Sequence, residues 1–171
     1  MGNIFNEDFR DFISALNNND VEYILVGGYS VILHGYSRTT GDLDIWIKKE
    51  KENCHKLLLA FEESKMPVFD MTQNNFLSNP AMRVFTFGRP PRSIDIMTNV
   101  KGLHFEETFA ASKIIEIENL KIRLIHLNQL IQAKRASGRH KDLDDNRNPY
   151  LEICSPINKR QNARQNSHYR R

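Results

Sequence analysis

Two aspartates, Asp42 and Asp44, stand two residues apart in a segment that is otherwise typical of an apolar strand. Residues two apart on a strand share a face, with Cα atoms roughly 6.6 Å apart, while Leu43 and Ile45 would take the opposite, buried face. Two carboxylates on one face repel each other unless a cation lies between them. Mg²⁺ suits such a pair, because it takes oxygen ligands and can share the phosphates of a substrate. An isolated pair of this kind more often closes a turn and faces water. The neighbouring residues therefore determine whether a metal site is the better interpretation.

A third acid, Asp95, lies in a second strand-like segment, Ser93 to Met97. Its side chain would point away from Ile94 and Ile96, just as the first two acids point away from their apolar neighbours. Alone, Asp95 would be an edge-strand acid more often than a catalytic one. Together with the pair, it predicts a site able to hold two divalent ions roughly 3.5–4 Å apart.

Gly27 and Gly28 follow the apolar segment Glu22 to Val26 and precede a short helical pattern. Glycine allows a sharp turn and lets a phosphate approach the backbone closely. The free N–H groups at the start of the next helix would then face the anion. One helix and one loop separate Gly28 from Asp42. This spacing predicts that the turn and the carboxylates meet at the same edge of a sheet.

The elements that must position these residues follow from periodicity, capping residues and breakers. Expected helices are a segment from Asn6 to Leu16, Tyr29–His34, Lys51–Glu63, Leu127–Ala136 and a short one from Lys141 that ends before Pro149. Expected strands are Glu22–Val26, Leu43–Lys48, Met82–Phe87, Ser93–Thr98, Lys113–Glu118 and Lys121–His126. This order predicts an α/β (α+β) domain with a mixed sheet, flanking helices and a small C-terminal helical cap.

The chain has 171 residues and a formal charge of +3, which fits one domain with a core. We expect this domain over residues 1–150 and a basic, loosely held tail over residues 151–171. Residues 155–171 contain five bases and no acid, so the rest of the chain carries 19 bases and 21 acids. The basic character therefore belongs to the tail, and charge alone does not indicate a nucleic-acid binder. Two cysteines exclude a disulfide framework, and we expect a cytoplasmic protein without a membrane span.

The run Gly27-Gly28-Tyr29-Ser30, with Arg38, Thr40, Asp42 and Asp44, resembles the nucleotidyltransferase superfamily with the polymerase-beta-like fold. It is most similar to the stand-alone bacterial branch that includes abortive-infection and toxin–antitoxin nucleotidyltransferases. The segment from Gln132 to Asp142 is similar to a further motif of that branch. The resemblance covers roughly residues 6 to 148.

The resemblance implies that Asp42, Asp44 and Asp95 bind Mg²⁺ or Mn²⁺. It also implies nucleotide-binding roles for Gly27, Gly28, Ser30, Arg38, Lys134, Lys141 and Asp142. An acceptor oxygen would attack the α-phosphorus in line, and pyrophosphate would leave. Many members of the superfamily have serine directly after the glycine, whereas Tyr29 stands there in this chain. We therefore expect backbone amides to hold the phosphates more than the hydroxyl of Ser30 does.

Lys134 falls on one helical stripe with Leu127, Leu130 and Ile131. A lysine that ends an apolar stripe either reaches out to water or meets an acid in the site. The resemblance favours the site. Lys141 and Asp142 would contact phosphate and assist acid–base chemistry, or they form an ordinary surface ion pair.

Three functions fit these observations. The first is a nucleotidyltransferase that uses a nucleoside triphosphate and acts on RNA such as tRNA, on protein or on a small hydroxyl compound, in a toxin-like system with an antitoxin protein as partner. The second is an antibiotic nucleotidyltransferase, which would need an enclosed apolar pocket. The third is a non-catalytic domain that binds a nucleotide or a partner. The presence of all three carboxylates favours the enzymes.

Overall fold

The computed structural model describes residues 3–138, which fold around one six-stranded mixed sheet. The strand order is β3-β4-β2-β1-β6-β5. The strands are β1 (Tyr23–Val26), β2 (Asp42–Ile47), β3 (Val84–Arg89), β4 (Arg92–Met97), β5 (Lys113–Ile117) and β6 (Leu120–Leu124). The helices are α1 (Glu7–Asn18), α2 (Gly27–Leu33), α3 (Lys51–Glu63), α4 (Gln73–Ser78), α5 (Phe105–Ala111) and α6 (Leu127–Ser137). The predicted fold class, a mixed sheet with flanking helices, is confirmed.

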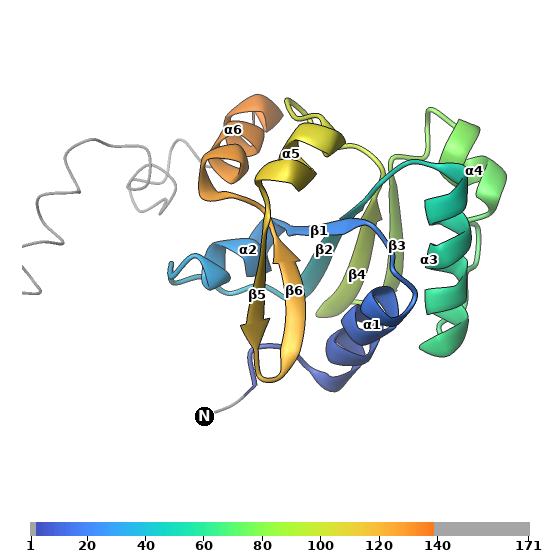
Figure 1. Cartoon of the computed structure of the whole chain (residues 1–171), viewed down its shortest axis with the longest axis horizontal. Coiled ribbons are helices and arrows are strands. Elements are labelled where there is room, and N and C mark those ends of the chain that lie inside the picture. The colour runs from blue at the N-terminus through green and yellow to red at the C-terminus, as the bar shows by residue number, and fades with distance from the viewer. Residues whose placement is uncertain (1–2, 139–171) are drawn as a thin grey trace, which may run out of the picture.

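The two faces of the sheet bury different sets of side chains. On one face, alternate strand residues such as Leu25, Leu43 and Ile94 join α1 and α3 in the larger core. On the other face, Ile24 and Trp46 pack with α5 and α6 in a smaller core. Figure 1 shows α1 and α3 together on one side of the molecule, and α5 beside α6 at the opposite end of the view. The acids of β2 and β4 share the face of Trp46, because strand residues alternate between faces.

The observed helices and strands agree closely with the predicted ones where the apolar pattern extends over many residues. Helix α3 has the predicted bounds, and Asn6 caps α1 by accepting a hydrogen bond from the Phe9 N–H. The strands expected over Met82–Phe87 and Ser93–Thr98 form the antiparallel pair β3–β4, and those expected over Lys113–Glu118 and Lys121–His126 form the antiparallel pair β5–β6. Helix α2 begins at Gly27 rather than Tyr29, so both glycines belong to its first turn. Helices α4 and α5 were not predicted, since each is a short piece of two turns or fewer.

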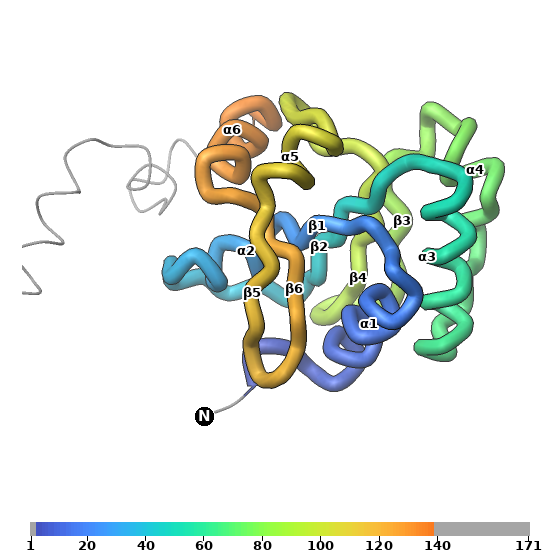
Figure 2. Tube along the Cα trace, in the orientation of Figure 1, coloured from blue at the N-terminus to red at the C-terminus, as the bar shows by residue number. Residues whose placement is uncertain are grey.

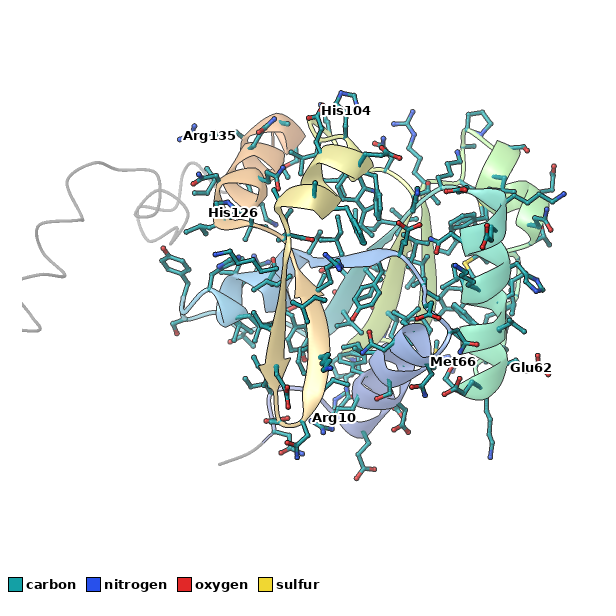
Figure 3. The ribbon with its side chains drawn as sticks, in the orientation of Figure 1. Arg10, Glu62, Met66, His104, His126 and Arg135 are labelled. Atoms are coloured by element: carbon teal, nitrogen blue, oxygen red, sulfur yellow. The ribbon has the colours of Figure 1, made fainter. Side chains whose placement is uncertain are left out.

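The N-terminal segment is held against the tip of the β5–β6 hairpin. Glu118 at this tip accepts hydrogen bonds from the Ile4 N–H at 3.0 Å and from the Arg10 guanidinium at 2.6 Å. The tube in Figure 2 shows this segment passing the tip, and Figure 3 labels Arg10 at the foot of β6. The contact fixes Phe5, whose buried ring lies 4.9 Å from that of Tyr29 in α2. The N-terminal segment thereby supports the helix that carries the glycine turn.

Several predictions concern residues outside the described part of the chain. The helix expected from Lys141, the boundary at residue 150 and the basic tail all fall after residue 138. Within residues 3–138, none of the helices combines the length and the apolar character that a bilayer crossing requires.

Candidate functional site

Four strands bring one row of residues side by side on the face of the sheet that carries Trp46. Val26 of β1 pairs with Asp44 of β2, Asp44 pairs with Asp95 of β4, and Asp95 pairs with Thr86 of β3. The row is therefore Val26–Asp44–Asp95–Thr86, with the glycine turn at its β1 end. Asp42 precedes Asp44 by two residues on the same face of β2. The structure thus brings the three predicted carboxylates together, with Asp95 beside the pair rather than facing away.

Asp44 lies within the row, between Val26 and Asp95. Burial, and next the negative charge of Asp95, raise the pKa of Asp44 to about 6. A hydrogen bond from the backbone N–H of Gly28 and the positive charge of Lys134 act in the opposite direction, while Asp42 adds to the rise. The carboxylate of Asp44 is therefore held by the glycine turn but is only partly compensated in charge.

Gly27 makes room for this arrangement. Its φ angle is +68°, in the left-handed region that side chains disfavour, and a Cβ atom there would overlap the Asp44 carboxylate. The amide of the next residue, Gly28, is the one that bonds to Asp44. We predicted that the two glycines open the backbone to a phosphate. In the structure, their first effect is to let the carboxylate of β2 approach the start of α2.

Hydroxyl groups orient the other two carboxylates. Ser93 donates a hydrogen bond to Oδ1 of Asp42 at 2.7 Å, and Thr86 donates one to Oδ1 of Asp95, also at 2.7 Å. Sequence analysis did not single out either residue for the site. A signal was present for Ser93, which stands two residues before Asp95 and so shares its face. Thr86 could be placed only from the register of the β3–β4 hairpin.

The predicted phosphate-binding residues have different surroundings. Ser30 is fully buried, and its hydroxyl donates a hydrogen bond to the Gly27 carbonyl oxygen at 2.6 Å. This bond stabilises the glycine turn from its buried side. Arg38 is exposed on the loop before β2. Lys134 of α6 is partly buried and is close enough for its charge to act on Asp44. Lys141 and Asp142 lie outside the described residues.

A hollow of about 760 Å³ adjoins the loop that leads into Asp42. Its walls come from the N-terminal segment, the loop before β2 and the β3–β4 turn, and include Glu7, Tyr29, Thr40 and Arg92. Burial raises the pKa of the Tyr29 hydroxyl, while the charge of Arg92 lowers it and that of Asp42 raises it. The tyrosine that replaces serine in the glycine motif therefore faces both the hollow and the charges next to it.

Comparison with known proteins identifies the family. A family model described as "Nucleotidyltransferase of unknown function (DUF6036)" matches residues 7–153. The chain belongs to this family. The predicted membership of the nucleotidyltransferase superfamily is thus confirmed.

A solved structure shares the fold of this nucleotidyltransferase-family protein. It is the crystal structure of a "putative nucleotidyltransferase" from Thermotoga maritima, with a TM-score of 0.53 and 16% sequence identity. The alignment covers 80% of this chain and 86% of the other. At this identity the likeness concerns the fold alone. No match was found among curated proteins.

Nucleotidyltransferases generally use a divalent metal. Whether this family member could hold one depends on the side chains that could act as ligands. Within residues 3–138, no three His, Cys, Asp or Glu side chains already stand in the arrangement of a metal site. The ligand type nevertheless fits, since Asp42, Asp44 and Asp95 offer only hard carboxylate oxygens. The charge also fits, because the negative charges of Asp95 and Asp42 raise the pKa of Asp44 further, beyond the larger effect of its burial. The three acids therefore match a hard divalent cation in chemistry.

Proposed function

We propose that this protein is a metal-dependent nucleotidyltransferase, which moves a nucleoside monophosphate from a nucleoside triphosphate to a hydroxyl or phosphate acceptor. The observation that carries the proposal is the pairing of Asp44 with Asp95 across β2 and β4, with Asp42 on the same face and the glycine turn adjoining. Membership of a nucleotidyltransferase family supports the same reaction class.

Asp42, Asp44 and Asp95 would hold Mg²⁺ or Mn²⁺. When bound, the cation supplies positive charge to the transferring phosphoryl group and to the leaving pyrophosphate. The chain's own residues position these acids: Gly28 holds Asp44 through its amide, and the hydroxyls of Ser93 and Thr86 hold the other two. A fixed set of carboxylates reduces the reorganisation needed during the reaction.

Two cationic side chains would meet the phosphates on the glycine-turn side of the row. Lys134 is close enough to Asp44 to lower its pKa, and Arg38 lies on the loop that leads into β2. In the proposed reaction the acceptor oxygen would form a bond to the α-phosphorus, and a hydroxyl acceptor would release its proton to a carboxylate of the row or to water. The bond from the α-phosphorus to the bridging oxygen breaks, and pyrophosphate leaves toward these cations. Lys141 and Asp142 stay predictions from the family resemblance, as do the antitoxin partner and the toxin-like role.

Transfer of label tests the proposal. The protein is incubated with each α-labelled nucleoside triphosphate, Mg²⁺ and total cell extract, and label is followed into RNA, protein and small molecules. We expect Asp44→Asn to lose transfer by at least a hundredfold, because it removes a metal-binding charge at the centre of the row. Asp11→Asn, an exposed acid of α1 on the opposite side of the sheet, is the matched control. Equal transfer by the wild type and Asp44→Asn would reject the site.

The antibiotic alternative depends on an enclosed pocket near the acids. The hollow of about 760 Å³ is large enough for a small acceptor, and its lining includes Glu7, Asp8 and Arg92 but none of the three acids of the site. Label that enters an aminoglycoside-type compound in a defined mixture, and not RNA or protein, would favour this second candidate.

A further inference from the structure

We infer that the outer edge of β3 is a docking site for an extended, acidic segment of a partner protein, which adds to the sheet as a further strand. Main-chain hydrogen bonds to an exposed sheet edge give such segments their affinity. Three observations support the inference: outward backbone groups along β3, arginines on one face of this strand, and a strained, exposed phenylalanine beside it. The inference does not depend on the proposed reaction.

The outer edge of β3 carries backbone groups that no neighbouring strand uses. The carbonyl oxygen of Arg83 accepts a hydrogen bond from the Thr98 N–H at 3.0 Å, so these two residues are bonded across the hairpin. Bonded and non-bonded pairs alternate in an antiparallel ladder. By the register of β3 with β4, the N–H and C=O groups of Val84, Thr86 and Gly88 therefore point outward. Within the described part of the chain, β3 pairs with β4 alone.

This edge is open to solvent. Val84 is 44% exposed, and Thr86 and Gly88 are exposed as well. Among the described strands, β3 is the outermost one beyond β4 (Figure 1). Natural sheets protect such edges with proline, with charged side chains or with very short strands. The outward positions of β3 carry neither a proline nor a charge, so the middle of this edge can accept another strand.

Charge identifies the kind of strand that fits. Arg83 directly before β3 and Arg89 at its end are exposed and share the face of Phe85. Residues 71–94 contain three arginines and no acid. None of the ion pairs formed by the described residues includes these arginines. Acids six positions apart on an added strand would face Arg83 and Arg89, and opposite charges on neighbouring strands stabilise their pairing.

An exposed aromatic side chain lies beside the same face. Phe69, in the segment between α3 and α4, is 71% exposed, and its ring stacks on that of Phe87 with centroids 6.3 Å apart. Its φ angle is +49°, which bulky side chains rarely adopt. Strained residues of this kind concentrate at ligand-binding and switch regions. Phe69 therefore offers an apolar contact to the residues that lie between the two acids of the added strand.

A second copy of the chain fits this edge less well. Two β3 strands related by a two-fold axis would run antiparallel to each other. The register that uses all the outward groups of both copies, centred on Thr86, places Arg83 opposite Arg89 of the other copy. Like charges directly opposite each other are destabilising. The arginines thus favour a different, acidic chain over self-association.

Peptide display on the full-length protein tests the inference. A library of random peptides about twelve residues long is selected on the immobilised chain, and enriched peptides are synthesised with fluorescein for anisotropy measurements. We expect the enriched peptides to carry Asp or Glu six positions apart. Apolar residues should follow the first acid by two and four positions, because alternate residues of a strand share a face.

Two proline variants distinguish the two edges of the sheet. Val84→Pro removes an outward N–H of β3 and keeps the hydrogen bonds to β4, since Val84 belongs to a non-bonded pair. Ile114→Pro is the matched control on β5. The two-residue turn of the β5–β6 hairpin is closed by the bonded pair of Ile117 with Leu120, so the exposed Ile114 also directs its N–H outward. Binding should fall at least tenfold in the β3 variant alone.

Charge reversal tests the acidic character of the partner without a change to the backbone. Arg83→Glu with Arg89→Glu should weaken binding of the acidic peptides about tenfold at low salt, because attraction becomes repulsion. Peptides in which lysine replaces both acids should recover binding to this variant. Lys51→Glu with Lys65→Glu changes the net charge equally at exposed positions on and next to α3, and should bind the acidic peptides like the wild type.

The outcomes decide for or against the inference. Loss of binding in the β3 variants alone, with recovery by the lysine peptides, supports it. Failure to enrich any peptide, unchanged binding by the β3 variants, or an equal loss in the control variants overturns it. If thermal melting shows that Val84→Pro is unfolded, the charge-reversal variants decide.

A second copy at this edge would give a different result. A dimer in light scattering that Arg83→Glu with Arg89→Glu leaves intact and Val84→Pro converts to a monomer overturns the inference, because the edge then holds another copy of this chain. None of these measurements uses a nucleotide. Their failure is therefore distinct from a failure of label transfer, which concerns the proposed function.

Discussion

Asp44 and Asp95 lie directly opposite each other in the parallel pairing of β2 with β4. Strand neighbours in this position bring their side chains to within contact distance, and like charges there are destabilising. Burial and the charge of Asp95 raise the pKa of Asp44 to about 6. The acids proposed to hold a metal therefore lower the stability of the fold when no cation is bound. This trade-off is common where activity needs groups that folding disfavours.

The first prediction is that Asp44→Asn stabilises the metal-free protein at neutral pH. An acid with a raised pKa in the folded state binds its proton more tightly there than in the unfolded chain, so stability falls as pH rises from about 4 to about 6. The difference from the ordinary value of 3.8 corresponds to about 3 kcal/mol at most. Partial exposure to solvent reduces the expected gain to about 1–2 kcal/mol.

Urea unfolding in EDTA measures this gain. At pH 7.5 the asparagine variant should unfold at a higher urea concentration than the wild type, and below pH 4 the two should converge. Asp11→Asn serves as the control, since it removes an exposed acid of α1. A variant that is less stable than the wild type at pH 7.5 would contradict the description of the acid row.

The second prediction concerns added metal. Mg²⁺ or Mn²⁺ should raise the melting temperature of the wild type by on the order of 5 °C near saturation, because binding to the folded state alone stabilises it. Asp44→Asn and Asp95→Asn should each lose most of this rise, since each removes a charged ligand. Thermal shift with increasing metal measures the effect. A rise that persists in both variants would locate the cation elsewhere.

The third prediction separates two effects of a side chain at position 27, backbone strain and overlap with the Asp44 carboxylate. Gly27→Ala introduces a side chain at φ +68° and places its Cβ where the Asp44 carboxylate lies, whereas Gly35→Ala does so at φ +91° with nothing within 4 Å. Gly35→Ala should cost about 1–2 kcal/mol from backbone strain alone. Gly27→Ala should cost more and should also abolish transfer of label. Urea unfolding and transfer assays on both variants provide the comparison, and equal losses of stability with retained transfer would show that the close approach is unimportant.

Long periodic patterns predicted most of the scaffold, and local patterns predicted part of the site. Helix α3 was predictable because Cys54, Leu57 and Phe61 form one apolar stripe over thirteen residues. Helix α4 was missed, since six mostly polar residues bury only Phe76 and carry no periodic signal. Alternation along β2 and β4 predicted which face the acids occupy. That alternation also made their convergence a reasonable expectation.

Contacts between distant segments could not be read from the sequence. The bond from Ser93 to Asp42 spans 51 residues and depends on which strands become neighbours. The same holds for the amide of Gly28, which local reasoning assigned to a phosphate and which the fold directs to Asp44. Serine 30 illustrates the converse case, because its hydroxyl fits a phosphate-binding motif by type but is turned inward to the Gly27 carbonyl. Residue type and spacing therefore predicted which residues lie at the site better than they predicted the hydrogen bonds that those residues form.

The fourth prediction tests whether Thr86 positions Asp95. Thr86→Val removes the hydroxyl that donates to Oδ1 of Asp95 at 2.7 Å and keeps the shape of the side chain. Thr86 is exposed on an edge strand that accepts β-branched residues, so stability should change by less than about 0.5 kcal/mol. The kcat should fall about tenfold, because Asp95 loses the group that orients it, while KM for the nucleotide should change little. Steady-state transfer at saturating Mg²⁺ measures both constants.

Thr86→Ser is the rescue control for the same position, since it restores a hydroxyl without the methyl group. A positioning role requires the serine variant to recover most of the lost kcat. If valine and serine reduce kcat equally, the methyl group and not the hydrogen bond determines the effect. If neither reduces it, the bond to Asp95 has no part in the reaction, and the orientation of that carboxylate must depend on its neighbours in β2 and on the bound cation.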